Sequence, residues 1–218
     1  MNIYPKFPSE EEWQKVIDSS GRIKNLSFCA CCKKDNKEFS DSLQHFNDKL
    51  GKIRISYYFL QYYYNLPGSE ELFQYYVENF YIRFFSVWEF IYHLANEFYR
   101  FWVDSDGRRG FKGDVIRRLS KTDRVLNDYL KRIEQEHSDF MLAKKYRNSI
   151  VHQIFPGEPA VELVRMEWNG ELRTQIKEAV SPAEFVKNIG AAAYLLSETL
   201  DLLEKEFDDH DCDIKNRG

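Results

Sequence analysis

Aromatic residues are concentrated in one stretch of this sequence, and their number limits how the chain can fold. Twenty of the 35 Phe, Tyr and Trp residues lie between Tyr57 and Trp102. Residues 70–102 have helical periodicity, but they carry too many charges for a membrane span and too many rings for a surface helix. The rings occupy more than one side of this helix, so one buried face cannot accommodate them. A second buried surface is therefore required.

Two arrangements would provide that second surface. Either two neighbouring helices of the same chain cover the aromatic helix, or a homodimer interface covers one side of it. Stacking of nucleic-acid bases on the rings is less favoured, because the rings lie among aliphatic rather than basic residues.

Most of the remaining sequence also has the 3.6-residue periodicity of α-helices. Serine residues with an acidic residue three positions later mark two helix starts, Ser9 with Glu12 and Ser181 with Glu184. The expected helices cover residues 9–19, 39–64, 70–102, 114–119, 122–154 with a bend near His137, and 182–207.

One segment instead has the alternating pattern of β-strands. Apolar residues alternate with polar ones on both sides of Asn169-Gly170. This dipeptide is a strong signal for a type I′ hairpin turn, because both residues tolerate positive φ. We therefore expect an all-α fold, a multi-helix bundle with one β-hairpin inserted at about residues 161–177.

The cysteines fit a reducing compartment. There are four, too few for a disulfide scaffold, and three lie in Cys29-Ala30-Cys31-Cys32. Cys29 and Cys32 have the spacing of a zinc-ligand pair, and His210 with Cys212 would complete four ligands, but a plain structural cluster is the favoured interpretation. Since no signal peptide or membrane span is recognisable, we expect a cytoplasmic protein with no cofactor and no membrane association.

The most informative residues are Arg147-Asn148-Ser149-Ile150-Val151-His152, near the end of the helix expected over residues 122–154. Asn148 and His152 are four residues apart and share a helix face, whereas Arg147 lies about 140° round from His152. Arg147 is expected at the edge of the apolar stripe. An arginine, an amide and an imidazole at one helix end are the groups that a metal-independent ribonuclease needs.

This string resembles the Arg-Asn-x-x-x-His form of the HEPN superfamily signature, found in small all-helical domains that often act as ribonucleases. The Asn after Arg147, the β-branched run before His152 and the helix break at Pro156-Gly157 carry the resemblance. It implies a HEPN-like domain over residues 67–207. Residues 1–66 would then form an N-terminal helical extension with a cysteine-bearing loop, and residues 208–218 a polar tail.

The resemblance also implies a function, a metal-independent endoribonuclease that acts as a homodimer. Arg147, Asn148 and His152 of two protomers would line one cleft around the scissile phosphate of an RNA substrate. His152 would transfer protons, Arg147 would stabilise charge on the phosphoryl oxygens, and Asn148 would hold the imidazole or the phosphate. A role as a toxin or phage-defence effector, with an antitoxin or regulatory protein as partner, is typical of such domains.

The charge distribution adds a candidate RNA-binding strip. The net charge of −4 argues against a general nucleic-acid binder, yet residues 108–147 contain twelve Lys or Arg against six acidic residues. The expected RNA-binding residues are Lys144, Lys145, Arg117 and Arg118. A mixed, solvated helix surface is the competing interpretation of the same charges.

A function from another class stays open. The chain would then be a non-catalytic HEPN-like module that dimerises or binds a nucleotide or protein ligand, with the hairpin as a docking edge. Arg147 and His152 would in that case only stabilise their helix end. The sequence favours the enzyme, because three catalytic residue types occur together at the family spacing.

Overall fold

The computed structural model describes residues 23–27, 37–104, 110–152, 155–157, 160–165, 172–177 and 179–216. For the two strands and for residues 211–216 the description is limited to the backbone. The helix expected over residues 9–19, the Cys29–Cys32 cluster and the Asn169-Gly170 turn lie outside the described residues.

The described residues form six helices and two strands, so the predicted all-α class is confirmed. No described helix has both the length and the hydropathy needed to cross a lipid bilayer. The helices are α3 (Lys37–Tyr64), α4 (Glu70–Phe98), α5 (Phe111–Thr122), α6 (Arg124–Glu136), α7 (Ser138–Val151) and α8 (Pro182–Asn216).

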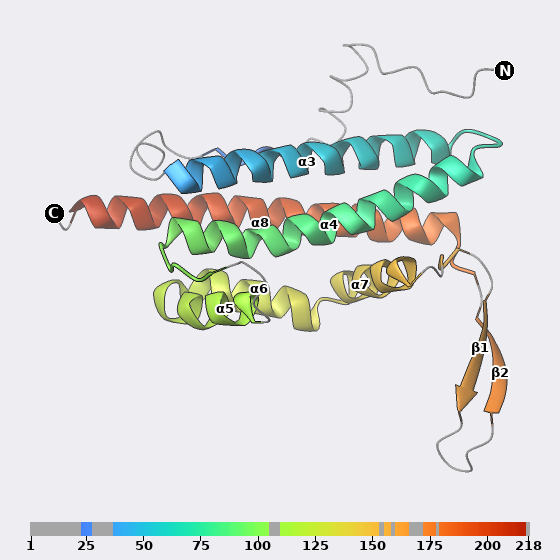
Figure 1. Ribbon diagram of the computed structural model, residues 1–218. Coiled ribbons are helices and arrows are strands. Elements are labelled where there is room, and N and C mark those ends of the chain that lie inside the picture. The colour runs from blue at the N-terminus through green and yellow to red at the C-terminus, as the bar shows by residue number, and fades with distance from the viewer. Residues whose placement is uncertain are drawn as a thin grey trace.

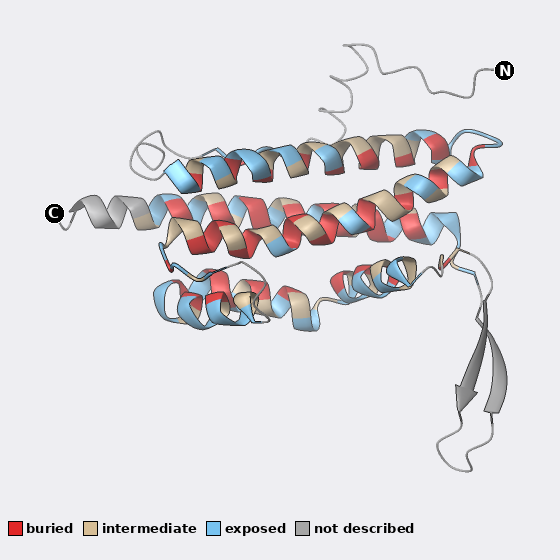
Figure 2. Ribbon diagram, viewed as in Figure 1, coloured by how far each residue is buried: buried red, intermediate tan, exposed pale blue. Residues whose placement is uncertain are grey.

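Helices α4 and α8 form the middle layer of the bundle, as Figure 1 shows. Helix α3 packs against them on one side, and α5, α6 and α7 pack on the other. Buried residues follow the inward faces of all three layers (Figure 2). The rings of α4 are thus covered on two sides by helices of the same chain, which confirms the first of the two arrangements considered above. Its buried aromatic residues are Phe73, Phe80, Tyr81, Phe84, Phe85, Trp88 and Tyr92.

Two strands extend from the end of the bundle where α8 begins (Figure 1). Strand β1 (Ala160–Arg165) pairs antiparallel with β2 (Leu172–Lys177), within the segment expected to form a hairpin. The ladder joins Arg165 to Leu172. If Asn169 and Gly170 formed a two-residue turn, Arg165 would pair with Thr174. The observed register is therefore not the register of such a turn.

Helix α4 ends at Phe98, four residues before the expected end. The side chain of Asn96 folds the chain back, because its Oδ1 accepts from the Val103 N–H at 3.0 Å and its Nδ2 donates to the Val103 carbonyl at 3.2 Å. Arg100 and Trp102 have φ values of 51° and 55°, which an α-helix does not permit. Local hydrogen bonding thus overrides the helical periodicity at this end.

Helix α8 is longer than expected, since its backbone is helical to Asn216 instead of ending near Phe207. The aromatic residues at the end of α4 pack against Phe207 and against the first of the added turns. The Phe207 ring stacks on Phe98 with centroids 4.0 Å apart, and His210 packs edge-on against Tyr99 at 4.9 Å. Tertiary packing therefore supports the helix as far as His210, within the segment that the sequence marks as a polar tail.

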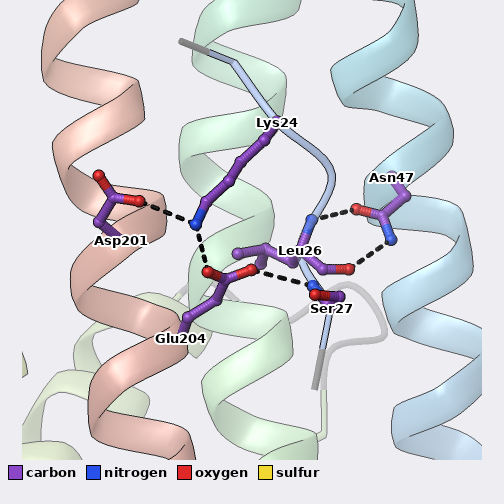
Figure 3. A network of polar contacts seen from close by, with 6 residues as sticks. All are labelled: Lys24, Leu26, Ser27, Asn47, Asp201 and Glu204. Atoms are coloured by element: carbon purple, nitrogen blue, oxygen red, sulfur yellow. Dashed lines mark hydrogen bonds and ion pairs between the residues drawn. The ribbon is translucent and has the colours of Figure 1, made fainter. Parts of the chain in front are cut away.

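Residues 23–27 run as a short strap between α3 and α8 (Figure 3). The side-chain amide of Asn47 on α3 bonds to both backbone groups of Leu26, at 2.9 and 3.0 Å. On the other side, Lys24 forms ion pairs with Asp201 and Glu204 of α8, and these carboxylates raise the pKa of the Lys24 ammonium. The strap therefore links helices α3 and α8, which lie far apart in the sequence.

Candidate functional site

The Arg147–His152 string lies on α7 and at its C-terminal cap. The bend predicted near His137 is confirmed, because α6 ends at Glu136 and His137 has an extended backbone before α7 begins. The predicted start of this helical segment, Thr122, is two residues too early, because α6 begins at Arg124. Thr122 ends α5, and the Asp123 carboxylate caps α6 by accepting from the Leu126 N–H at 2.9 Å.

The inward face of α7 is fixed by aromatic packing. Near the start of the helix, the Phe140 ring lies 4.7 Å from that of Trp88 on α4. In its last turns, Tyr146 packs against Tyr81 of α4 at 5.6 Å and against Phe185 of α8 at 5.1 Å. Two helices thus determine how α7 is rotated, and this rotation decides which residues face solvent.

A buried hydrogen-bond chain anchors the beginning of α7. The Tyr81 hydroxyl donates to Oδ1 of Asn188 at 2.9 Å, and Nδ2 of Asn188 donates to the backbone carbonyl of Asp139 at 3.0 Å. Tyr81 and Asn188 are buried. Burial raises the pKa of the Tyr81 hydroxyl, so it remains a donor. These two hydrogen bonds therefore join α4, α8 and α7.

The outward face of α7 carries the predicted catalytic residues. Asn148 and His152 are exposed and Arg147 is half-buried, at the edge of the apolar face as expected. The Arg147 Nη1 donates to Asn148 Oδ1 at 3.2 Å, and the backbone N–H of His152 donates to the Asn148 carbonyl at 3.1 Å. Among the residues that the structure describes, no carboxylate pairs with Arg147. The guanidinium, the amide and the imidazole therefore share one solvent-facing helix end.

The expected RNA-binding residues fall into two separate groups. Lys144 and Lys145 are exposed on α7, beside the catalytic candidates. Arg117 and Arg118 lie on α5, which Figure 1 places at the opposite end of the α5–α7 layer from the end of α7. They have other partners: Arg117 pairs with Asp114 at 2.7 Å, and Arg118 bonds to the Phe101 carbonyl. The structure does not bring these two arginines to the string.

The zinc hypothesis concerns residues that are mostly not described. Cys29, Cys32 and the Cys212 side chain lie outside the described part of the chain. The remaining candidate ligand, His210, packs its ring against Tyr99 and Phe98. Over the described residues, no group of three or more His, Cys, Asp or Glu side chains is arranged to hold a metal ion.

Sequence reasoning missed a cavity beyond the end of α7. It has a volume of about 720 Å³ and lies between the α3–α4 turn, residues 155–157 and the start of α8. Its walls come from segments far apart in the sequence, so no local pattern reveals it. The sequence marks only two of the helix ends that border it, by the Pro67-Gly68 break and the Ser181 cap. The aromatic residues of its lining are Tyr63, Tyr64, Phe73, Phe155 and Phe185.

No curated protein and no solved structure matches this chain. One family model does: that of the Cthe2314-like HEPN family matches residues 42–176, which is more than half of the chain and includes all of α4 to α7. The match begins inside α3, within the segment expected to be an N-terminal extension, so the division at residue 66 stays a prediction. With the helical bundle and the Arg-Asn-x-x-x-His string on its α7, the chain belongs to the HEPN superfamily.

Proposed function

We propose that this protein is a metal-independent endoribonuclease, with Arg147, Asn148 and His152 as its catalytic residues. The observation that carries the proposal is their joint placement on the solvent-facing end of α7, where the Arg147 guanidinium bonds to the Asn148 amide. A structural role for Arg147 would require an internal acid or loop carbonyl as its partner. No such contact of Arg147 occurs among the described residues, and its hydrogen bond to Asn148 lies at an exposed position, which supports a role in phosphate binding.

The reaction that suits these groups is attack by the ribose 2′-hydroxyl on the adjacent phosphorus. A new 2′-O–P bond forms and the P–O5′ bond breaks, leaving a 2′,3′-cyclic phosphate and a 5′-hydroxyl. One imidazole takes the proton of the 2′-hydroxyl, and an imidazolium protonates the departing 5′-oxygen. The planar Arg147 guanidinium would stabilise the charge that develops on the phosphoryl oxygens.

This chemistry needs a base and an acid, and one α7 presents one imidazole. HEPN domains often dimerise, and a two-fold pairing of α7 helices would supply a second His152. Met141 and Val151, on the same outward face as Asn148 and His152, have exposed fractions of 51% and 52%. A pairing across this face of α7 would cover both side chains.

Lys144 and Lys145 would hold the RNA backbone on this face. Both are exposed, and they lie eight and seven residues before His152 on the same helix face. Because the rest of the chain is acidic overall, phosphate binding would be restricted to this end of α7. Arg117 and Arg118 are not included in the proposed site, because their partners and their position on α5 separate them from it.

The proposal is tested by incubating the purified full chain with a mixed RNA pool in excess EDTA and identifying the new ends. We expect cyclic phosphate and 5′-hydroxyl ends from the parent chain, and no cleavage by His152→Ala or Arg147→Ala. His45→Ala is the matched control, since His45 is exposed on α3 and should be dispensable. Cleavage that EDTA abolishes, or that survives His152→Ala, contradicts the proposal.

We propose that this ribonuclease activity serves as a toxin or in defence against phage. Expression of the parent chain in bacteria should slow growth, and His152→Ala should relieve the effect. If neither His152→Ala nor Arg147→Ala relieves toxicity, and the pure protein leaves RNA intact, the non-catalytic module becomes the better interpretation. An antitoxin or regulatory partner would restore growth when it is expressed with the parent chain.

A further inference from the structure

The cavity beyond α7 adjoins the proposed catalytic residues. Phe155, which lines the cavity, is only three residues from His152, so their Cα atoms are at most about 11 Å apart. The ring packing places the cavity at the same end of the helix. Phe155 stacks on Phe185 with centroids 5.4 Å apart, and Phe185 contacts Tyr146 on the inward face of the last turns of α7. The cavity and His152 therefore lie at the same end of α7, close enough for one RNA strand to contact both.

The walls of the cavity suit a flat aromatic ligand. Tyr64 lies at the rim with 43% of its surface exposed, and its ring is 5.7 Å from that of Phe73 in the wall. Exposed tyrosine rings at the mouth of an aromatic cavity are suited to stacking on nucleobases. The volume of about 720 Å³ lies within the range of small-molecule sites and is ample for a single base.

The polar part of the lining favours the base over the phosphate. Glu70 is the one charged side chain in the described lining, and it is an acid, which repels a phosphate. A carboxylate accepts hydrogen bonds from the amino groups of cytosine, adenine or guanine, whereas uracil offers only its ring N3–H, which lies between two carbonyl oxygens that the carboxylate repels. The side-chain amides of Asn65 and Gln74 provide further donors and acceptors.

We infer that this cavity binds one unpaired, amino-bearing base of the RNA substrate, next to the scissile phosphate. The inference rests on the proposed function and extends it to substrate selection. Stacking on Tyr64 provides affinity, and the Glu70 carboxylate distinguishes amino-bearing bases from uracil. The enzyme then cleaves single-stranded RNA at positions set by the base held in the cavity.

The first test titrates the 5′-monophosphates of adenosine, cytidine, guanosine and uridine into the full chain carrying His152→Ala, by calorimetry. We expect at least one amino-bearing nucleotide to bind about tenfold more tightly than the uridine nucleotide. Adding Tyr64→Ala should weaken binding about tenfold, because a stacking ring is lost. Adding Glu70→Gln should remove the discrimination against uridine. Both residues are exposed, so both variants should fold.

Trp102→Ala is the matched aromatic control. Trp102 is 70% exposed and follows the C-terminal end of α4, whereas the cavity lies at the N-terminal end of that helix. Its removal should leave nucleotide binding unchanged. Undetectable binding, equal affinity for all four nucleotides, or an equal loss in Trp102→Ala and Tyr64→Ala overturns the inference.

The second test separates an RNA base from a free nucleotide. A single-stranded hexanucleotide of mixed sequence is titrated into the His152→Ala chain with and without Tyr64→Ala, and we expect a loss of about tenfold. If only mononucleotide binding weakens, the cavity takes a free nucleotide and the inference is wrong. Neither titration requires cleavage, so a parent chain that cuts no RNA refutes the proposed function without altering either result.

Discussion

Arg147 donates a hydrogen bond from Nη1 to Oδ1 of Asn148 at 3.2 Å on the solvent-facing end of α7. The contact joins neighbouring residues of one helix, so it needs no partner chain or substrate to form. It holds the guanidinium fork beside the exposed Asn148 and His152. Asn148 would thereby position Arg147 for a phosphate as well as contact the substrate itself.

Changing Asn148 should therefore affect cleavage and leave stability unchanged. Asn148→Ala should lower kcat by about tenfold or more, through loss of a hydrogen bond to the charged guanidinium. Asn148→Asp should lower it further, since the new carboxylate pairs with Arg147 and repels the phosphate. Both changes should alter the free energy of unfolding by less than about 0.5 kcal/mol, because the residue is exposed. An Asp variant faster than the Ala variant contradicts this positioning role.

Tyr81→Phe should destabilise the fold, although only one oxygen atom is lost. It removes the donor to Asn188 and leaves a buried amide oxygen without a partner, at a cost of about 1–3 kcal/mol in the free energy of unfolding. Chemical denaturation measures the difference. Tyr75→Phe on the same helix is the control, since Tyr75 is 54% exposed and its change should have little effect. Equal stabilities of the two variants would refute the prediction.

Glu134 should be the main polar link between α6, α5 and α4. Its Oε1 accepts from Trp88 Nε1 at 2.7 Å and from the Tyr92 hydroxyl at 3.0 Å, and its Oε2 pairs with Lys112 Nζ at 2.7 Å. Glu134→Ala should lower the free energy of unfolding by about 2–3 kcal/mol, because the indole and the phenol lose their acceptor.

Glu134→Gln provides the comparison within that cluster. Glutamine retains one acceptor oxygen for Trp88 and Tyr92 but loses the charge that pairs with Lys112, so its effect should be smaller than that of alanine. Glu136→Ala, at an exposed position on the same helix, should be close to neutral. A glutamine variant as unstable as the alanine variant would show that the ion pair, rather than the acceptor, dominates.

Glu206→Gln should stabilise the protein at neutral pH. Burial, and then the negative charge of Asp123, raise the pKa of the Glu206 carboxyl above its ordinary value of 4.5. A raised pKa means that the folded state disfavours the ionised form. The parent chain is therefore destabilised above the folded-state pKa, and this effect disappears as the pH falls through that pKa towards the unfolded value.

The expected gain from Glu206→Gln is less than about 1 kcal/mol at pH 7, because solvent partly screens the carboxyl. Thermal unfolding followed from pH 7 to pH 4 should show the two Tm values converging at the acidic end. Glu198→Gln, exposed on the same helix, is the control for a charge change at the surface and should alter the Tm at pH 7 by less. A gain that persists at pH 4 would point to a cause other than ionisation.

Local chemistry made several features predictable. Ser181 and Glu184 form the expected capping box at the start of α8, with the Ser181 N–H donating to Glu184 Oε2 at 2.9 Å. These hydrogen bonds also lower the pKa of the Glu184 carboxyl. The bend at His137 and the shared face of Asn148 and His152 follow in the same way from residues within a few positions of each other. The match of the HEPN family model confirms the superfamily that the Arg-Asn-x-x-x-His string indicates.

Other features depend on residues that are distant in the sequence. The turn of α8 that follows Phe207 forms beside Phe98 and Tyr99, although the sequence after Phe207 is polar. Arg117 and Arg118 look like part of one basic strip with Lys144 and Lys145, yet the packing of α5 and α7 on α4 separates the pairs. The cavity near His152 has walls from three separate segments.

By itself, then, the sequence determined the helical class, most helix boundaries and the catalytic candidates on one helix face, because helical periodicity, capping and i to i+4 spacing act over a few residues. Only the tertiary structure decided which side of α7 faces solvent, which cations accompany Arg147, and where a cavity opens. Those outcomes result from aromatic packing and buried hydrogen bonds between α4, α7 and α8, which no local pattern encodes.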